Sequence, residues 1–426
     1  MRSLPILGFV VLVIGAPTAC RDDTPGGGIV LRVSDWGSPA VESAFMTVER
    51  ELQEGFERRH PGVRVRKEQI PGPGQYAPKL CMMHVAGSAP DVMHLDASSA
   101  AIFIDNGVLL DLAPLMKNDP TFDRSHYFEN VLDITRRGDA FYSVPLDFTP
   151  MMMYYNRKLF DRAGVPYPKD GWSWDDFLAA CKATTIVPAG ARQPTQYGYN
   201  FENVMPFWMP WLWTNGGDVL DPTGTRASGF FDGPASVEAM RFLTELMVTH
   251  HVAPTLAERA ALGGDAFLNG KAAMDLKGHW MLIDYRARGL DVGAVSLPSR
   301  TGRPVTVIYA TGLAISRHTR HRELAWEYVK YMTSAAVQIR RVASGLAISG
   351  NRQAAAHYAA DPANDVERAF LKAVDYARPP WGSRVENYPY CESLGEEMME
   401  DILYGATSVE EAVRRTAGLM DAVLSP

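Results

Sequence analysis

Strand-like and helix-like segments alternate along the first part of the chain, and this alternation constrains the fold more than any other feature. Residues 29–33 form a short apolar run that predicts a strand, and apolar residues then recur at helical spacing over residues 45–56. Apolar and basic residues alternate over residues 63–66, as in a second strand, and residues 92–95 form a further strand-like run. This alternation of strands and helices predicts an α/β lobe with helices packed on a sheet.

The length of the chain calls for more than one such unit. A chain of 426 residues exceeds what one hydrophobic core usually serves, so at least two domains or lobes are expected. Hydrophobic residues make up 46% and charged residues 21%, a composition that excludes disordered chains and proteins that span the membrane many times. The formal net charge of −7 argues against nucleic acid as the main partner.

The N-terminus has the features of a targeting signal. An almost unbroken apolar run over residues 4–16 is shorter than a transmembrane helix requires, so residues 1–19 are predicted to be a signal peptide. Small residues precede Cys20, in a pattern that resembles a bacterial lipoprotein signal and implies lipidation of Cys20, although Pro17 stands where leucine is usual. Residues 20–28 are then a flexible tether. An ordinary cleaved signal peptide is the alternative, and the mature protein is exported either way.

Three further cysteines, Cys81, Cys181 and Cys391, match no metal-binding spacing, and no metal site is predicted. Their odd number leaves at least one of them unpaired. Cys181 continues a helical pattern of apolar residues, which predicts core packing. A disulfide between Cys81 and Cys391 stays open at this point, because an exported protein can form one.

A tryptophan that closes a glycine-containing motif is the strongest candidate for a ligand contact. Residues 266–280 read AFLNGKAAMDLKGHW, in which a small apolar element ends at Gly278. Glycine lets the backbone turn sharply without steric cost, and Trp280 follows at once with a wide aromatic face. The alternative is that Trp280 is buried in the core.

Further motifs occur in the order found in one protein family. They are Gly138, Tyr142 and Pro145; Y-x-N-x-x-L-F over residues 154–160; A-G-V-x-x-P over residues 163–168; W-x-D at residues 174–176; N-G-G at residues 215–217; and the segment 309–316. Together with the F-x-x-G-x-A-A-M and G-x-W elements of residues 267–280, they resemble the extracellular solute-binding proteins of family 1, sugar type, which serve ABC importers. The match spans nearly the whole mature chain.

The resemblance implies an α/β fold of the periplasmic-binding-protein-like type II class, in which a hinge joins two lobes and the ligand cleft lies between them. The N-terminal lobe is expected to comprise residues 29–146 and 311–347, and the C-terminal lobe residues 148–309 and 348–426. Closure of the lobes around the ligand is the implied mechanism.

The candidate ligand-binding residues follow strand ends or belong to the family motifs, because α/β lobes bind ligands at the carboxyl ends of their strands. They are Trp36, Asp96, Ser98, Asp147, Trp208, Trp211, Trp280, Tyr309, Gly312 and Trp381. Carboxylates accept hydrogen bonds from sugar hydroxyls, and aromatic faces cover the apolar side of a sugar ring. The alternatives are that the three polar side chains cap turns or helices and that Trp208 and Trp211 are core residues.

The sequence therefore predicts the extracytoplasmic substrate-binding component of an ABC transporter, which captures a sugar or oligosaccharide and delivers it to membrane permease subunits. Such a protein would be a monomer without a cofactor, held by its lipid anchor in the periplasm or on the outer face of the cytoplasmic membrane. No G-x-S-x-G, H-E-x-x-H or phosphate-binding-loop motif occurs, so an enzyme is not predicted. The alternatives are a binder of another polyol-like ligand, such as a glycerol phosphodiester, and a secreted carbohydrate hydrolase, which needs paired carboxylates.

Overall fold

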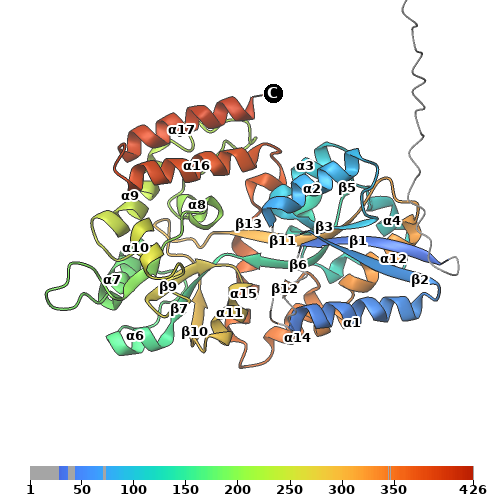
Figure 1. The fold of residues 1–426 in the computed structure, drawn as a ribbon, viewed down its shortest axis with the longest axis horizontal. Coiled ribbons are helices and arrows are strands. Elements are labelled where there is room, and N and C mark those ends of the chain that lie inside the picture. Colours follow the sequence, from blue (N-terminus) through green and yellow to red (C-terminus); the bar gives the residue numbers. More distant parts are fainter. Residues whose placement is uncertain (1–27, 37–43, 71–72, 344, 346, 426) are drawn as a thin grey trace, which may run out of the picture.

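The computed structural model describes residues 28–36, 44–70, 73–343, 345 and 347–425. This part of the chain forms two α/β lobes side by side, each built around its own sheet, as the alternation and the length predicted (Figure 1). The predicted signal peptide, Cys20 and the tether up to residue 27 lie outside the described residues. Within the described ranges, no helix has the length and apolar character that crossing a membrane requires.

The first lobe is built on a seven-stranded sheet in the order β12-β6-β11-β3-β1-β2, with β13 paired to β11. Its strands are β1 (Ile29–Trp36), β2 (Val63–Ile70), β3 (Val92–Asp96), β6 (Val144–Pro150), β11 (Thr306–Ile315), β12 (Ile348–Ser349) and β13 (Ala377–Arg378). β1 pairs in parallel with β2 and β3, whereas β11 runs antiparallel between β3 and β6. The three strands predicted from the alternation are therefore confirmed.

Helices cover this sheet because apolar residues at helical spacing turn one face of each helix toward the strands. In α1 (Ala44–Arg59), Leu52 and Phe56 are buried in one core with Leu31 and Val33 of β1. The other helices around this sheet are α2 (Pro73–Val85), α3 (Ala100–Asp105), α4 (Ala113–Asn118), α5 (Glu129–Leu132), α12 (Arg322–Thr333), α13 (Ala335–Val342) and α14 (Arg352–Ala359). A separate hairpin pairs β4 (Arg136–Arg137) with β5 (Ala140–Phe141).

The second lobe is built on a four-stranded sheet in the order β10-β7-β9-β8. Its strands are β7 (Met152–Asn156), β8 (Tyr197–Asn200), β9 (Ala272–Lys277) and β10 (Val292–Val295). Its helices are α6 (Arg157–Ala163), α7 (Trp174–Thr184), α8 (Met205–Thr214), α9 (Pro234–Val248), α10 (Leu256–Ala261), α11 (Met281–Ala287), α15 (Asp365–Ala373), α16 (Tyr388–Leu403) and α17 (Val409–Leu424). All six residues of β9 are buried, so the A-A-M motif forms a central strand that is covered on both faces.

Aromatic side chains form much of the core of the second lobe. Trp174 of α7 stacks on Phe242 of α9 with ring centroids 4.4 Å apart, and Trp211 of α8 packs against both rings. α7 begins at Ser173, which forms a capping box with Asp176 and satisfies backbone N–H groups at the helix start. This core fixes α7, α8 and α9 behind the sheet.

The three described cysteines are free thiols. Cys181 is fully buried in the core of the second lobe, so the predicted packing role is confirmed. Cys81 lies half-buried on α2 and Cys391 lies buried on α16, and the disulfide that the sequence left open is not formed between them.

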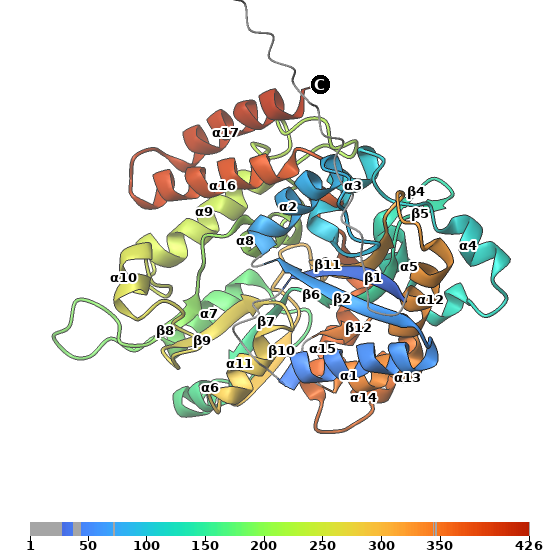
Figure 2. The same ribbon diagram turned by 45° about the vertical axis from the view of Figure 1, so that its right-hand side comes forward.

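The lobes are joined by crossings that are hydrogen-bonded to each other. β6 of the first sheet runs through Met151 directly into β7 of the second sheet. The N–H of Met151 donates to the carbonyl of Val307 at 2.9 Å, and the Thr306 hydroxyl donates to the carbonyl of Met151 at 2.6 Å. The two crossings therefore form one paired ribbon (Figure 2).

Strand pairing does not follow the expected lobe boundaries residue by residue. β6, β11 and β12 pair within the first sheet, including residues 148–150, 306–309 and 348–349, which were expected in the C-terminal lobe. Hydrogen bonds assign a crossing strand to one sheet, although its side chains can still face the other lobe. The expected lobe boundaries near residues 148–150, 306–309 and 348–349 therefore stay a prediction.

Candidate ligand-binding cleft

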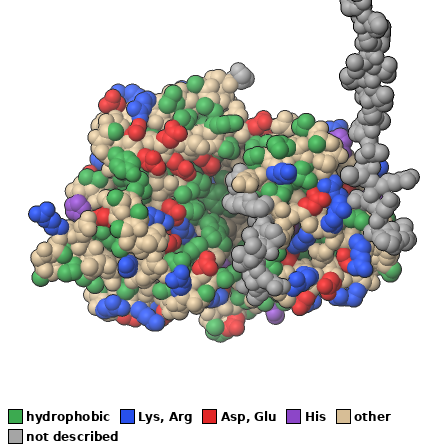
Figure 3. Space-filling model, in the orientation of Figure 1, with side chains coloured by type: hydrophobic (Ala, Val, Ile, Leu, Met, Phe, Trp, Pro, Cys, Tyr) green, Lys and Arg blue, Asp and Glu red, His purple; other side chains and the backbone are tan. Residues whose placement is uncertain are grey.

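The face of the molecule in Figure 3 is hollowed between the two lobes, and hydrophobic side chains line the hollow. Strand β11 of the first sheet contacts helix α8 of the second lobe in this region, where the hydroxyl of Tyr309 lies 3.5 Å from the carbonyl oxygen of Pro206. Acidic side chains gather on the second-lobe rim of the hollow. We therefore take this hollow as the candidate ligand cleft.

Trp280 is half-buried at the start of α11, directly after the turn that the glycine motif predicted. Its ring lies over Gly278, where an added Cβ would come within 1.9 Å of the ring, so only glycine leaves room for this orientation. The ring centroid of Phe207 lies 6.4 Å from that of Trp280, with 35° between the planes. Both rings stay partly exposed, and we call them the aromatic pair.

Helix α8 presents Phe207 and buries its tryptophans. Trp208 and Trp211 are 1% and 0% exposed, and both belong to the core of the second lobe. The Nε1 of Trp208 donates to the side-chain oxygen of Asn203 at 3.2 Å. The structure thus does not bring Trp208 and Trp211 to the cleft, because the faces of α8 on which they lie are packed in the core of the second lobe. Phe207 was not singled out from the sequence, since residues 205–213 are apolar at every position and carry no helical periodicity.

Two candidates on β11 have different surroundings. Tyr309 is the one half-buried residue of this ten-residue strand, and burial raises the pKa of its hydroxyl well above the ordinary value, with Glu392 and Asp96 adding to the shift. Gly312 lies where a Cβ would come within 2.2 Å of the Ser143 hydroxyl, next to an irregularity in the register between β11 and β6. Gly312 therefore permits close packing of the two crossing strands.

Asp96 ends β3, as expected of a residue at the carboxyl edge of the sheet, and it also caps the short turn that follows. One of its carboxylate oxygens accepts hydrogen bonds from the backbone N–H of Ser98, at 2.7 Å, and from the Ser98 hydroxyl. Burial raises the pKa of Asp96, against these hydrogen bonds, and the charge of Asp147 adds to the shift. The capping role that the sequence left open thus holds for Asp96.

Asp147 lies on β6 and pairs with Arg341 of α13 at 2.7 Å. The same guanidinium donates to Glu49 of α1 at 2.6 Å. Burial alone would raise the pKa of Glu49, but Lys67 and Arg341 hold it below its ordinary value. Asp147 is therefore engaged with a buried cation, which the sequence did not indicate.

These contacts extend into a series of ionisable groups inside the first lobe. Lys67 of β2 contacts Glu49 at 3.1 Å and Asp35 of β1 at 3.2 Å, and His94 of β3 contacts Asp35 at 2.9 Å. We call the whole series the buried charge chain, and it consists of Asp147, Arg341, Glu49, Lys67, Asp35 and His94. Acidic and basic groups alternate along it, so each ion has a partner that offsets the cost of its burial.

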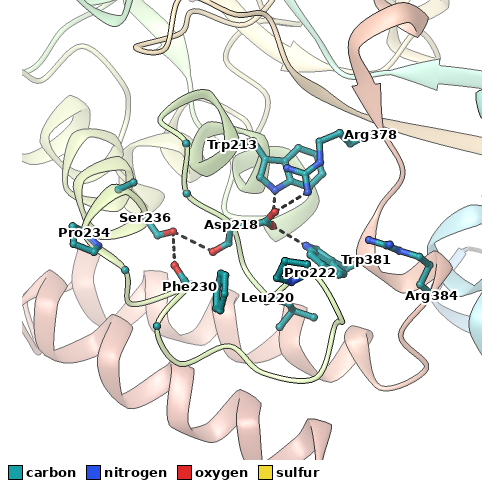
Figure 4. A pocket seen from close by; sticks show the side chains of 15 residues that line it. Trp213, Asp218, Leu220, Pro222, Phe230, Pro234, Ser236, Arg378, Trp381 and Arg384 are labelled. Atoms are coloured by element: carbon teal, nitrogen blue, oxygen red, sulfur yellow. Dashed lines mark hydrogen bonds and ion pairs between the residues drawn. The ribbon is translucent and has the colours of Figure 1, made fainter.

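Trp381 lies beside a second pocket, of about 570 Å³, in the second lobe (Figure 4). Its Nε1 donates to Asp218 at 2.9 Å, and the Nε1 of Trp213 donates to the same oxygen at 2.7 Å. Arg378 pairs with the other oxygen of Asp218 at 2.7 Å. Trp381 is 3% exposed, and the lining of this pocket includes neither ring of the aromatic pair. The Trp381 ring is therefore engaged with Asp218 in the core of the second lobe.

Trp36 ends β1 at the same edge of the sheet as Asp96, but the position of its side chain is outside the described part of the structure.

One carboxylate neutralises two basic groups, Lys277 at the end of β9 and Arg259 of α10. Lys277 and Arg259 both pair with Glu202, the latter at 3.2 Å. Although burial raises the pKa of Glu202, these two cations lower it below the ordinary value. The Lys277 ammonium also lies 4.0 Å from the ring centroid of Phe207, which fixes that ring. Over the described ranges, no three His, Cys, Asp or Glu side chains are placed to hold a metal ion.

Comparisons with known proteins agree with this geometry. The family model for bacterial extracellular solute-binding proteins matches residues 40–339. The multiple sugar-binding protein of Streptococcus mutans is 26% identical over 318 residues, which cover 67% of this chain and 68% of the relative. Among solved structures, an ABC substrate-binding protein from Listeria monocytogenes in complex with cycloalternan has a TM-score of 0.81 at 22% identity, covering 93% of this chain and 98% of its own.

UgpB from Mycobacterium tuberculosis, in complex with glycerophosphocholine, has a TM-score of 0.77 at 22% identity, again covering 93% of this chain and 98% of its own. These likenesses confirm the expected periplasmic-binding-protein-like type II fold.

Proposed function

The chain belongs to the bacterial extracellular solute-binding proteins, and we propose that it captures a sugar or oligosaccharide and delivers it to the membrane permease of an ABC importer. The aromatic pair at the cleft carries this proposal. Trp280 and Phe207 offer two partly exposed rings to a ligand that enters between the lobes. Aromatic faces suit the apolar C–H side of a sugar ring, while carboxylates can accept hydrogen bonds from its hydroxyl groups. The relative from Streptococcus mutans, whose name describes sugar binding, supports the same reading.

Closure of the two lobes about the paired crossings is the proposed mechanism. Met151, between β6 and β7, and Thr306, at the start of β11, lie where the chain passes between the sheets, so a small rotation there narrows the cleft. The closed form then presents both lobes together to the permease. We propose that the protein acts as a monomer, because one chain supplies both walls of the cleft.

A glycerol phosphodiester is the second candidate ligand, suggested by the likeness to UgpB. A phosphate group calls for an available cation. Lys277 and Arg259 are paired with Glu202, and Arg341 is paired with Asp147. The charge pattern thus favours a sugar over a phosphodiester.

A thermal-shift screen against neutral mono- and oligosaccharides, glycerol phosphodiesters and no ligand tests the proposal. A ligand that binds only the folded protein raises stability by about 2.7 kcal/mol when present at 100 times its Kd. At least one sugar is expected to raise the melting temperature by several degrees and to be recovered chemically unchanged after long incubation. A response to phosphodiesters alone would overturn the sugar assignment, and cleavage of the sugar would instead support a hydrolase.

We also propose that Cys20 carries a lipid that holds the exported protein at the membrane, since small residues precede Cys20 and a glycine-rich tether follows. Cys20→Ser is expected to move the protein from the membrane fraction to the soluble fraction of exported proteins. Cell fractionation after expression in a bacterium with lipoprotein processing measures this. If the unsubstituted protein is already fully soluble, the anchor is wrong, and Pro17→Leu then tests whether the unusual residue is the reason.

A further inference from the structure

The turn that carries Trp280 is hydrogen-bonded to both strands of one crossing. The backbone N–H of His279 donates to the hydroxyl oxygen of Thr149, on β6, at 2.6 Å. The carbonyl oxygen of Gly278 accepts a hydrogen bond from the hydroxyl of Tyr154, on β7, at 3.4 Å. Because β6 runs directly into β7, both contacts come from the first crossing, and they connect the turn of the second lobe to it.

The residue before Trp280 is fixed through its backbone and through its side chain. Thr149 and His279 are both buried, and the Thr149 hydroxyl donates its own proton to the carbonyl oxygen of Pro150 at 3.2 Å. The imidazole ring of His279 meets the ring of Phe370 edge to face, with the centroids 5.0 Å apart. Trp280 follows in the chain and is half-buried, so the position of the buried His279 determines where the exposed part of the indole ring lies.

Thr149 also lies beside the aromatic residue of the other crossing. In the antiparallel pairing of β6 with β11, Thr149 is directly opposite Tyr309. Side chains that are directly opposite in such a pair lie on the same face of the sheet, with their Cβ atoms about 5 Å apart. Tyr309 and Trp280 both pack, as partly buried side chains, against the core of the second lobe. Thr149 thus connects the strand that carries Tyr309 with the turn that carries Trp280.

We infer that Thr149 is a positioning residue for sugar binding, whose hydroxyl holds the turn of Trp280 against the crossing strand and thereby presents the indole ring to the cleft. This inference rests on the proposed function and assigns a further residue to the same site. Without the hydroxyl, the buried N–H of His279 lacks its acceptor, which is costly. The turn then adopts other positions, in which the Trp280 ring no longer meets the sugar ring.

The first test removes the hydroxyl and retains the shape of the side chain. The probe is the neutral sugar that gives the largest melting-temperature shift in the thermal-shift screen, and Thr149→Val is expected to bind it about tenfold more weakly in titration calorimetry. Thr184→Val is the matched control, because the buried Thr184 hydroxyl of α7 also bonds to a backbone carbonyl, that of Ala180 at 2.8 Å. This control should change the affinity less than about twofold. Equal affinity losses in the two variants would overturn the inference.

A double-mutant cycle tests whether Thr149 acts through Trp280. When Thr149→Val is combined with Trp280→Ala, the affinity should fall less than about twofold below that of Trp280→Ala alone, since no indole ring remains to be positioned. A direct contact between the Thr149 hydroxyl and the sugar would instead give the same loss with and without the indole ring. Additive losses of this kind would contradict the positioning role.

Amide hydrogen exchange gives a readout that needs no sugar. The His279 amide is bonded to the Thr149 hydroxyl, so in Thr149→Val it should exchange at least about tenfold faster, while the amides of β9 keep their exchange rates. Mass spectrometry of peptides that cover residues 272–281 of the free protein measures both.

The possible failures can be told apart. Unchanged exchange of the His279 amide would overturn the inference, whether or not a sugar binds. If a sugar binds the unsubstituted protein and Thr149→Val equally well, the proposed function stands and only the inference falls. If no sugar of the screen binds the unsubstituted protein, the proposed function falls and the inference falls with it.

Discussion

Arg341→Met is expected to lower the free energy of unfolding by about 3–5 kcal/mol, because removing one partner of a buried ion pair leaves the other charge uncompensated. Arg341 is buried and contacts both Asp147 and Glu49, so its loss leaves Asp147 without its cation and Glu49 with Lys67 alone. Methionine retains much of the side-chain length, which limits the effect of lost packing. Chemical denaturation of purified protein, followed by circular dichroism, measures the change.

The neighbouring residue supplies a matched control. Arg340 pairs with Glu51 at 2.7 Å, but their side chains are 57% and 51% exposed. An exposed pair of this kind contributes little, so Arg340→Met should cost less than about 1 kcal/mol. If Arg341→Met and Arg340→Met lose similar amounts of unfolding free energy, burial of the ion pair does not explain the effect of Arg341→Met. Asp147→Asn, which retains the side-chain shape, serves as a second variant if Arg341→Met does not accumulate as folded protein.

Trp280→Ala is expected to weaken sugar binding roughly thirtyfold, since aromatic hot spots of binding sites often contribute about 2 kcal/mol or more. The ring is half-buried, next to Phe207, and orients over Gly278, so its outer face is available to a ligand. Titration calorimetry with a sugar identified in the thermal-shift screen measures the affinity of the folded variant.

Trp211→Ala separates binding from folding in this experiment. Trp211 is fully buried among aromatic side chains of the second lobe, so its loss should cost about 3–5 kcal/mol of stability. The folded fraction of this variant should retain its affinity for the sugar. If Trp280→Ala instead behaves like Trp211→Ala, with lower stability and unchanged affinity, then Trp280 is a core residue and the aromatic pair is not a binding surface.

Local patterns in the sequence predicted the first strands and helices, while the family resemblance implied the two-lobed architecture. The alternation near residues 29, 63 and 92 predicted three strands, and all three lie in the first sheet. The glycine motif predicted the turn before Trp280, and the steric contact between Gly278 and the Trp280 ring explains that pattern. Such features depend on residues that are close together in the sequence, so they can be predicted from the sequence alone.

Long-range contacts of the site could not be predicted in the same way. The partner of Asp147 is Arg341, 194 residues later, and nothing in the sequence close to Asp147 indicates such a partner. In α8 the aromatic residues follow one another without periodicity, so Phe207 could not be separated from Trp208 and Trp211.

The paired crossings limit the ways in which the molecule can open. Because Met151 is hydrogen-bonded to Val307 and Thr306, the strand that leaves the first lobe and the strand that returns to it turn together. A rotation of the lobes about this ribbon keeps the hydrogen bonds between the two crossings, whereas these bonds oppose a displacement of one crossing relative to the other. The proposed closure is therefore a rotation, in which the walls of the cleft approach each other at an angle and not in parallel.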